Sequence, residues 1–163
     1  MTNQPRDTLA EAIGRVAVAA SHADLMLRSL IPFLGGPGAG ALADGESRVA
    51  RLIEWCVKFK NQLYILDETV SEEFDRRAEK LKKLLTDRNT VIHVLWFQSD
   101  DDGLKVSQRR TGKKGYRPQG YSVDEINRLA QDIKNAVWDF SEIGDSVAHS
   151  EGVPFPPRRG DVG

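Results

Sequence analysis

The chain contains one cysteine, Cys56, among 163 residues, so it can form no internal disulfide and has no cysteine pair to hold a metal ion. A single cysteine is typical of a reducing compartment. The chain also lacks a strong charge of either sign, because 23 basic and 24 acidic residues leave a formal net charge of -1. It is therefore not a polycation as a whole, and any nucleic-acid binding must come from a local basic patch.

Long apolar runs are absent as well. No run approaches the roughly 20 residues of a membrane span, and the polar stretch from Met1 to Asp7 lacks the pattern of a signal peptide. We therefore expect a cytoplasmic protein with no membrane contact. No serine elbow is evident, and no Gly-Lys-Ser/Thr follows the glycine-rich stretch 35–40, which excludes a P-loop there. We expect no cofactor.

The first half of the chain has the three-and-four spacing of apolar residues that is typical of a helix face. Residues 7–31 have this spacing, with Asp7 or Thr8 as a cap, and we expect the helix to stop near Pro32. The glycine-rich stretch 35–40 then predicts a flexible loop. A second helix is expected from just after Asp44 to about residue 65.

The second half predicts two more helices. One starts at Ser71, with a serine cap and acidic residues in its first turn. The other starts at Ser122, whose spacing to Glu125 is that of a capping box. Between them, residues 96–107 alternate as in a β-hairpin with a turn at Asp102-Gly103.

These elements predict an all-α fold, a bundle of about four main helices with a small β-hairpin inserted before the last. We expect one helical domain over residues 7–150. Residues 1–6 are expected to be disordered, as are residues 151–163, which are rich in proline and arginine.

The six residues from Arg88 to His93 are the most informative stretch. Arg88 stands where the helix period calls for an apolar residue, and such breaks in pattern often mark functional positions. Asn89 and His93 are four residues apart and share a helix face, and Arg88 is long enough to reach the same side. No cluster of acids, cysteines or other histidines surrounds them, which argues against a metal site.

An imidazole beside a guanidinium suits metal-independent cleavage of RNA. The imidazole moves the proton of the 2′-hydroxyl or of the leaving oxygen, and the guanidinium stabilises charge on the phosphate. The ribose hydroxyl is the nucleophile, so the protein needs none. Arg88, Asn89 and His93 would then be catalytic, as general acid/base (His93), phosphate stabiliser (Arg88) and positioning group (Asn89).

At these residues the sequence resembles the HEPN domain family. Arg88, Asn89 and His93 match its Arg-x4–6-His motif in the Arg-Asn-x-x-x-His form, at the end of a middle helix. The resemblance extends over roughly residues 7–148. It implies a helical bundle that forms a homodimer, with motifs of two subunits making a metal-independent endoribonuclease site. It also implies a toxin or defence role, with a nucleotidyltransferase-like antitoxin as a possible partner.

Other readings of the motif stay open. The domain is either an active nuclease or a catalytically silent module that binds RNA, a nucleotide or a partner protein, and a purely structural dimerisation unit is a third possibility. Arg88 pairing with Asp24 or Asp87 would indicate a structural network. Asp24 either supports the site by orienting Arg88 or His93, or is a partly solvated carboxylate.

A basic segment without acids follows the expected hairpin. Its cations are candidates for binding RNA phosphates, and Tyr116 and Tyr121 are candidates for base stacking. The alternative is a solvated loop. The family resemblance does not imply a role for residues 98–120. The candidate RNA-binding residues are Arg109, Arg110, Lys113, Lys114 and Arg117.

Overall fold

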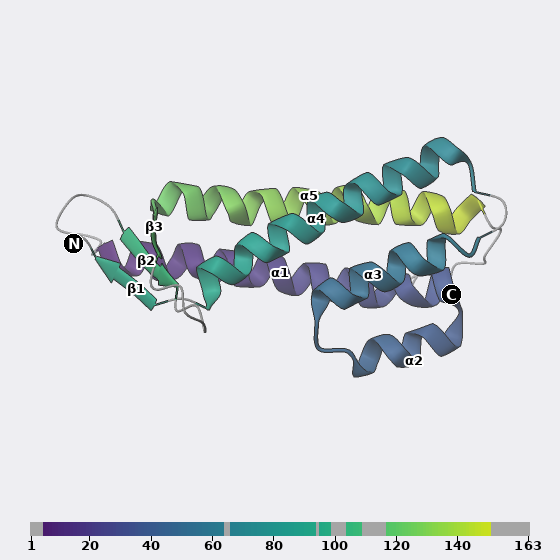
Figure 1. Cartoon of the computed structure of the whole chain (residues 1–163), viewed down its shortest axis with the longest axis horizontal. Coiled ribbons are helices and arrows are strands. Elements are labelled where there is room, and N and C mark those ends of the chain that lie inside the picture. Colours follow the sequence, from purple (N-terminus) through teal and green to yellow (C-terminus); the bar gives the residue numbers. More distant parts are fainter. Residues whose placement is uncertain (1–4, 64–65, 94, 99–103, 109–116, 151–163) are drawn as a thin grey trace, which may run out of the picture. The chain divides into compact units, whose positions relative to one another are not determined.

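The computed structural model describes residues 5–63, 66–93, 95–98, 104–108 and 117–150. In this part of the chain the structure is mainly helical, which confirms the all-α expectation in its coarse form (Figure 1). The helices are α1 (Pro5–Gly35), α2 (Pro37–Gly45), α3 (Val49–Lys60), α4 (Glu68–Ile92) and α5 (Val123–Ser150). The strands are β1 (Leu95–Gln98), β2 (Leu104–Gln108) and β3 (Arg117–Tyr121).

The chain divides into two compact units. The first comprises Met1–His22 and Lys83–Asn135, and the second Ala23–Lys82 and Ala136–Gly163. Helices α1, α4 and α5 each contribute residues to both units. Because three helices run through both, this division does not decide whether residues 7–150 behave as one domain, which stays a prediction.

The small sheet belongs to the first unit. β1 pairs antiparallel with β2, and β2 pairs antiparallel with β3, so β2 is the central strand. The turn expected at residues 102–103 lies outside the described residues. The third strand was not predicted, because its sequence Arg-Pro-Gln-Gly-Tyr has little β-propensity and contains proline and glycine. Pro118 is tolerated because β3 is an edge strand.

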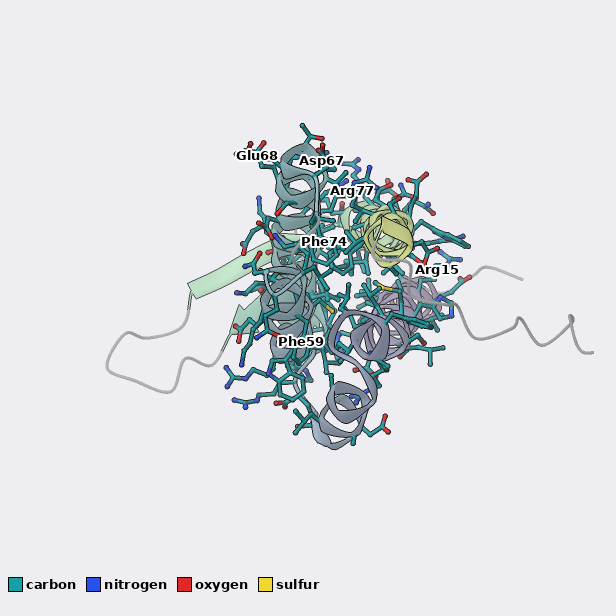
Figure 2. The ribbon with its side chains drawn as sticks, turned by 90° about the vertical axis from the view of Figure 1, so that its right-hand side faces the viewer. Arg15, Phe59, Asp67, Glu68, Phe74 and Arg77 are labelled. Atoms are coloured by element: carbon teal, nitrogen blue, oxygen red, sulfur yellow. The ribbon has the colours of Figure 1, made fainter. Side chains whose placement is uncertain are left out.

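Each unit has its own apolar core, built from the helix faces that the spacing predicted. In the second unit Phe74 of α4, labelled in Figure 2, has its ring centroid 4.8 Å from that of Phe140 of α5, in a tilted arrangement. Such aromatic pairs add to the stabilisation that comes from burial alone. Buried residues of the first unit include Ala12, Val16, Ala19, Leu85, Val91, Ile126 and Ile133. Those of the second include Leu27, Ile31, Leu52, Ile53, Leu81 and Val147.

The end of α1 corrects two expectations. The helix continues past Pro32 to Gly35, and the expected flexible loop at 35–40 is largely the start of α2. Pro32 lies within the last turn of α1, lacks the N–H that would continue the ladder, and the helix ends three residues later at Gly35. Gly36, with a φ of 78°, makes the sharp reversal that glycine permits, and Pro37 begins α2. A Cβ on Gly35 would lie 2.7 Å from Ala39 Cβ, so the glycine permits close packing of the two helices.

The other helix boundaries also differ in places. α3 runs from Val49 to Lys60 rather than from just after residue 44. α4 begins at Glu68, three residues before the predicted Ser71, because Asp67 accepts from the backbone N–H of Thr69 at 2.8 Å. The capping box of α5 is confirmed, since Glu125 accepts from the Ser122 N–H at 2.7 Å and Ser122 Oγ accepts from the Glu125 N–H at 3.1 Å.

The N-terminal helix differs from expectation in two respects. Residues 5 and 6, expected to be disordered, are helical, while residues 1–4 and the expected tail 151–163 lie outside the described residues. Residues Leu9–Gly35 are long and apolar enough to cross a membrane by length and composition alone. The expectation missed this because small alanines separate the larger apolar residues. Core helices and N-terminal signal sequences pass the same test, and 39% of the apolar window in this helix is buried within the protein.

Candidate functional site

The last turns of α4 carry the residues singled out by the sequence. The stripe that the spacing predicted on this helix is buried at Phe74, Ala78, Leu81 and Leu85. At the next position Arg88 is half-buried, so its guanidinium emerges at the edge of the apolar face. His93 is exposed and directly follows the last residue of the helix.

The structure brings the three motif residues together. Arg88 Nη1 donates to Asn89 Oδ1 at 2.9 Å and lies 3.5 Å from His93 Nε2. The backbone N–H of His93 donates to the Asn89 carbonyl at 3.1 Å. Asn89 therefore holds Arg88 with its side chain and the start of the His93 turn with its backbone.

The chemistry of the Arg88–His93 contact is specific. A guanidinium has only donors, so Arg88 Nη1 can donate to His93 Nε2 when that nitrogen carries a lone pair. That is the form of imidazole that can accept a proton from a hydroxyl group. Arg88 has no carboxylate partner among the described residues, and its buried Nε has no hydrogen-bond acceptor there. In the described part of the chain its charge is therefore not neutralised by an ion pair, unlike that of a salt-bridged arginine.

A tryptophan on the following strand fixes the end of α4, and the sequence reasoning missed this role. Trp96 Nε1 donates to the Val91 carbonyl at 3.0 Å, and the indole packs edge-on against Tyr121 with centroids 6.2 Å apart. Carbonyls in the last turn of a helix have no partner within the helix, so such a donor caps it. The available signal was a tryptophan three residues after the motif.

Asp24 has a different partner from those considered. It accepts two hydrogen bonds from Arg28, at 2.8 and 3.0 Å, and Arg28 also donates to the Glu46 carbonyl at 2.7 Å. The hydrogen bond with Asp24 raises the pKa of Arg28. These contacts tie α1 to the end of α2 within the second unit. A supporting role of Asp24 toward Arg88 or His93 stays a prediction.

Most of the basic segment lies outside the described residues. Arg109, Arg110, Lys113 and Lys114 lie outside the described residues, as does Tyr116. Arg117 is the first residue of β3, and the segment therefore connects β2 to β3 in the sheet that holds Trp96. RNA binding by these residues stays a prediction.

The second unit holds a buried cation that the sequence reasoning missed. Lys60 is 1% exposed, and its Nζ donates to Ser71 Oγ at 2.8 Å and lies 2.9 Å from Asp75. The ammonium also stands 5.8 Å from the centroid of the Phe74 ring. The Nζ of Lys60 thus has a hydroxyl acceptor in Ser71 and an ion-pair partner in Asp75. We interpret this cluster as structural.

Comparisons with family models, curated proteins and solved structures yielded no match to the chain. Among the described residues no group of three or more histidine, cysteine or acidic side chains is placed to hold a metal ion. The candidate site is the arrangement of Arg88, Asn89 and His93 at the end of α4.

Proposed function

We propose that this protein is a metal-independent endoribonuclease of HEPN type. The observation that carries the proposal is the convergence of Arg88, Asn89 and exposed His93 at the end of α4, with Arg88 Nη1 3.5 Å from His93 Nε2. A proton acceptor and a cation within one contact distance supply two of the functions needed to cleave an RNA phosphodiester, removal of the 2′-hydroxyl proton and stabilisation of charge on the phosphate.

In this proposal the RNA supplies the nucleophile. An imidazole takes the proton of the ribose 2′-hydroxyl, the 2′-oxygen attacks phosphorus, and the bond from phosphorus to the 5′-oxygen breaks. The products are a 2′,3′-cyclic phosphate and a 5′-hydroxyl, the leaving oxygen being protonated by an imidazolium. Arg88 stabilises the charge that grows on the non-bridging phosphate oxygens. Asn89 keeps Arg88 oriented by accepting its Nη1 hydrogen bond.

The single motif histidine, His93, cannot be both acid and base in one step, and a homodimer would supply a second His93 imidazole. We therefore propose that two copies place their His93 side chains at one phosphodiester. The proposal extends, through the same resemblance, to a cytoplasmic toxin or defence protein with a nucleotidyltransferase-like antitoxin. A mixture of wild-type and His93→Ala chains tests the shared site: a mixed dimer holds only one His93 and should be inactive, so activity should fall below the fraction of wild-type chains in the mixture.

The direct test is incubation of purified protein with mixed single-stranded RNA in EDTA, beside His93→Ala and the surface control His22→Ala. His22 is exposed on α1 and has no assigned role. We expect wild type and His22→Ala to leave cyclic phosphate ends and His93→Ala to leave none. Equal cleavage by His93→Ala would contradict the proposal. If wild type binds RNA without cleaving it, the silent binding module replaces the nuclease.

A further inference from the structure

The last turn of α4, which His93 directly follows, is held by two hydrogen bonds from outside the helix ladder or at its end. Val91 is the next-to-last residue of α4, and the indole N–H of Trp96 in β1 donates to its carbonyl at 3.0 Å. The backbone N–H of His93 donates to the Asn89 carbonyl at 3.1 Å, which is the second restraint on this turn.

Trp96 is itself held from two further directions. Its backbone is paired with Val106 in the β1–β2 ladder, and its ring meets the Tyr121 ring at 61°. Tyr121 is the last residue of β3, and Ser122, the cap of α5, follows it. An indole fixed by a strand pairing, a ring contact and a hydrogen bond has little freedom to release the Val91 carbonyl.

We propose that Trp96 is a positioning residue for His93, an inference that rests on the proposed ribonuclease function. Trp96 acts through the last turn of α4 and does not touch the substrate. Without its hydrogen bond this turn keeps only the His93–Asn89 backbone bond, and the imidazole samples orientations outside contact with the guanidinium. Displacement of a reacting group by about 1 Å can cost on the order of 10²-fold in rate.

The variant Trp96→Phe tests this most directly, because phenylalanine keeps an aromatic ring beside Tyr121 and removes only the donor. Trp138→Phe is the matched control, since Trp138 lies on α5 and is 69% exposed. We expect the His93 amide to exchange with solvent roughly 10-fold faster in Trp96→Phe and to be unchanged in Trp138→Phe. His93 exchange that is unchanged in a folded Trp96→Phe variant would overturn the proposal.

Kinetics separate positioning from a general loss of structure. We expect Trp96→Phe to lower kcat about 10- to 100-fold while KM changes less than about twofold, because substrate binding is kept and the proton acceptor is misplaced. A fall in activity due only to loss of folded protein would instead scale with the unfolded fraction. If wild type itself cleaves no RNA, the proposed function fails, and His93 exchange alone decides whether Trp96 fixes the turn.

A measurement on the unmodified protein covers the case in which Trp96→Phe does not fold. The indole N–H signals of Trp96 and Trp138 are compared for exchange with water. We expect the Trp96 signal to exchange at least about 10-fold more slowly, because it is bonded to a carbonyl and Trp138 is exposed. Equal exchange rates would overturn the proposal.

Discussion

Arg77 and Arg88 lie about three turns apart on α4, and their surroundings differ sharply. Arg77 is surrounded by acceptors: Glu73 binds its Nε at 2.5 Å, and the Asp139 carbonyl and the Glu142 carboxylate bind its Nη1 at 2.5 and 3.3 Å. Figure 2 labels this side chain on its helix. Arg88 has one amide oxygen and one distant imidazole nitrogen as its partners among the described residues.

The two arginines show how partner chemistry separates a structural cation from a functional candidate. The hydrogen bond from Arg77 to the Glu73 carboxylate raises the pKa of Arg77. The carboxylate also neutralises the positive charge of Arg77, which makes this arginine a poor anion-binding group. Arg88 keeps a charge that no described carboxylate neutralises, next to a group that accepts protons. Lys60 follows the pattern of Arg77, because Asp75 and Ser71 occupy its ammonium.

The largest expected effect comes from exchanging the two arginines for alanine. We expect Arg88→Ala to lower RNA cleavage by roughly 10²- to 10³-fold with little change in stability, because it removes transition-state charge stabilisation. We expect Arg77→Ala to keep cleavage and to lower the free energy of unfolding by about 1–3 kcal/mol, through lost charged hydrogen bonds. Urea unfolding and a cleavage assay on both variants measure this.

The control for that pair is Arg→Lys at each position. Lysine keeps the charge and loses the fork of donors, so Arg77→Lys should lose part of its network and Arg88→Lys part of its activity. If both alanine variants lose activity in proportion to their loss of stability, the distinction between the two arginines is wrong.

Lys60 gives the next largest effect. We expect Lys60→Ala to destabilise the protein by about 2–4 kcal/mol, because it empties a fully buried site beside Phe74. Lys60→Met keeps most of the volume, and Asp75 is 48% exposed and can be solvated, so its cost should be about 1 kcal/mol. Urea unfolding of both variants measures the difference. An equal cost for both variants would mean that the charge, and not the packing, makes this site.

The next prediction concerns RNA binding by the basic segment. Reversal of charge at Arg109, Arg110, Lys113 and Lys114 to glutamate should weaken RNA binding and reduce the slope of log K against log salt by about 1 per lost phosphate contact. The matched control reverses four exposed cations, Lys58, Lys83, Arg128 and Lys134, with the same change in net charge. Binding titrations at two salt concentrations check this. Equal losses in the two sets would indicate a net-charge effect only.

Sequence reasoning predicted the helix faces and the capping box well, because both depend on local spacing. It failed at Pro32 and the glycine-rich stretch, where small residues allow α2 to pack closely on α1, a tertiary effect that local propensity does not contain. The motif residues were found because Arg88 interrupts an apolar stripe. Lys60 and Trp96 were missed because their partners, Asp75 and Val91, are known only once helices and strands are placed.

The smallest predicted effect is the pH dependence of the stability that comes from Glu73, the carboxylate that pairs with Arg77. Hydrogen bonds from Arg76 and Arg77 lower the pKa of Glu73 to about 2, while an unfolded glutamate titrates at about 4.3. A lowered folded-state pKa stabilises the protein above the unfolded value, and the benefit is lost as pH falls from about 4.3 through 2. We therefore expect Glu73→Gln to melt at a lower temperature than wild type at pH 7, with the gap closing as pH approaches 2. Glu72→Gln, at an exposed position beside it, should show no such closing gap. A melting-temperature gap of constant size for Glu73→Gln would mean that the charge of the Glu73 carboxylate does not hold Arg77. Arg77 and Arg88 would then differ only in the number of their hydrogen-bond acceptors.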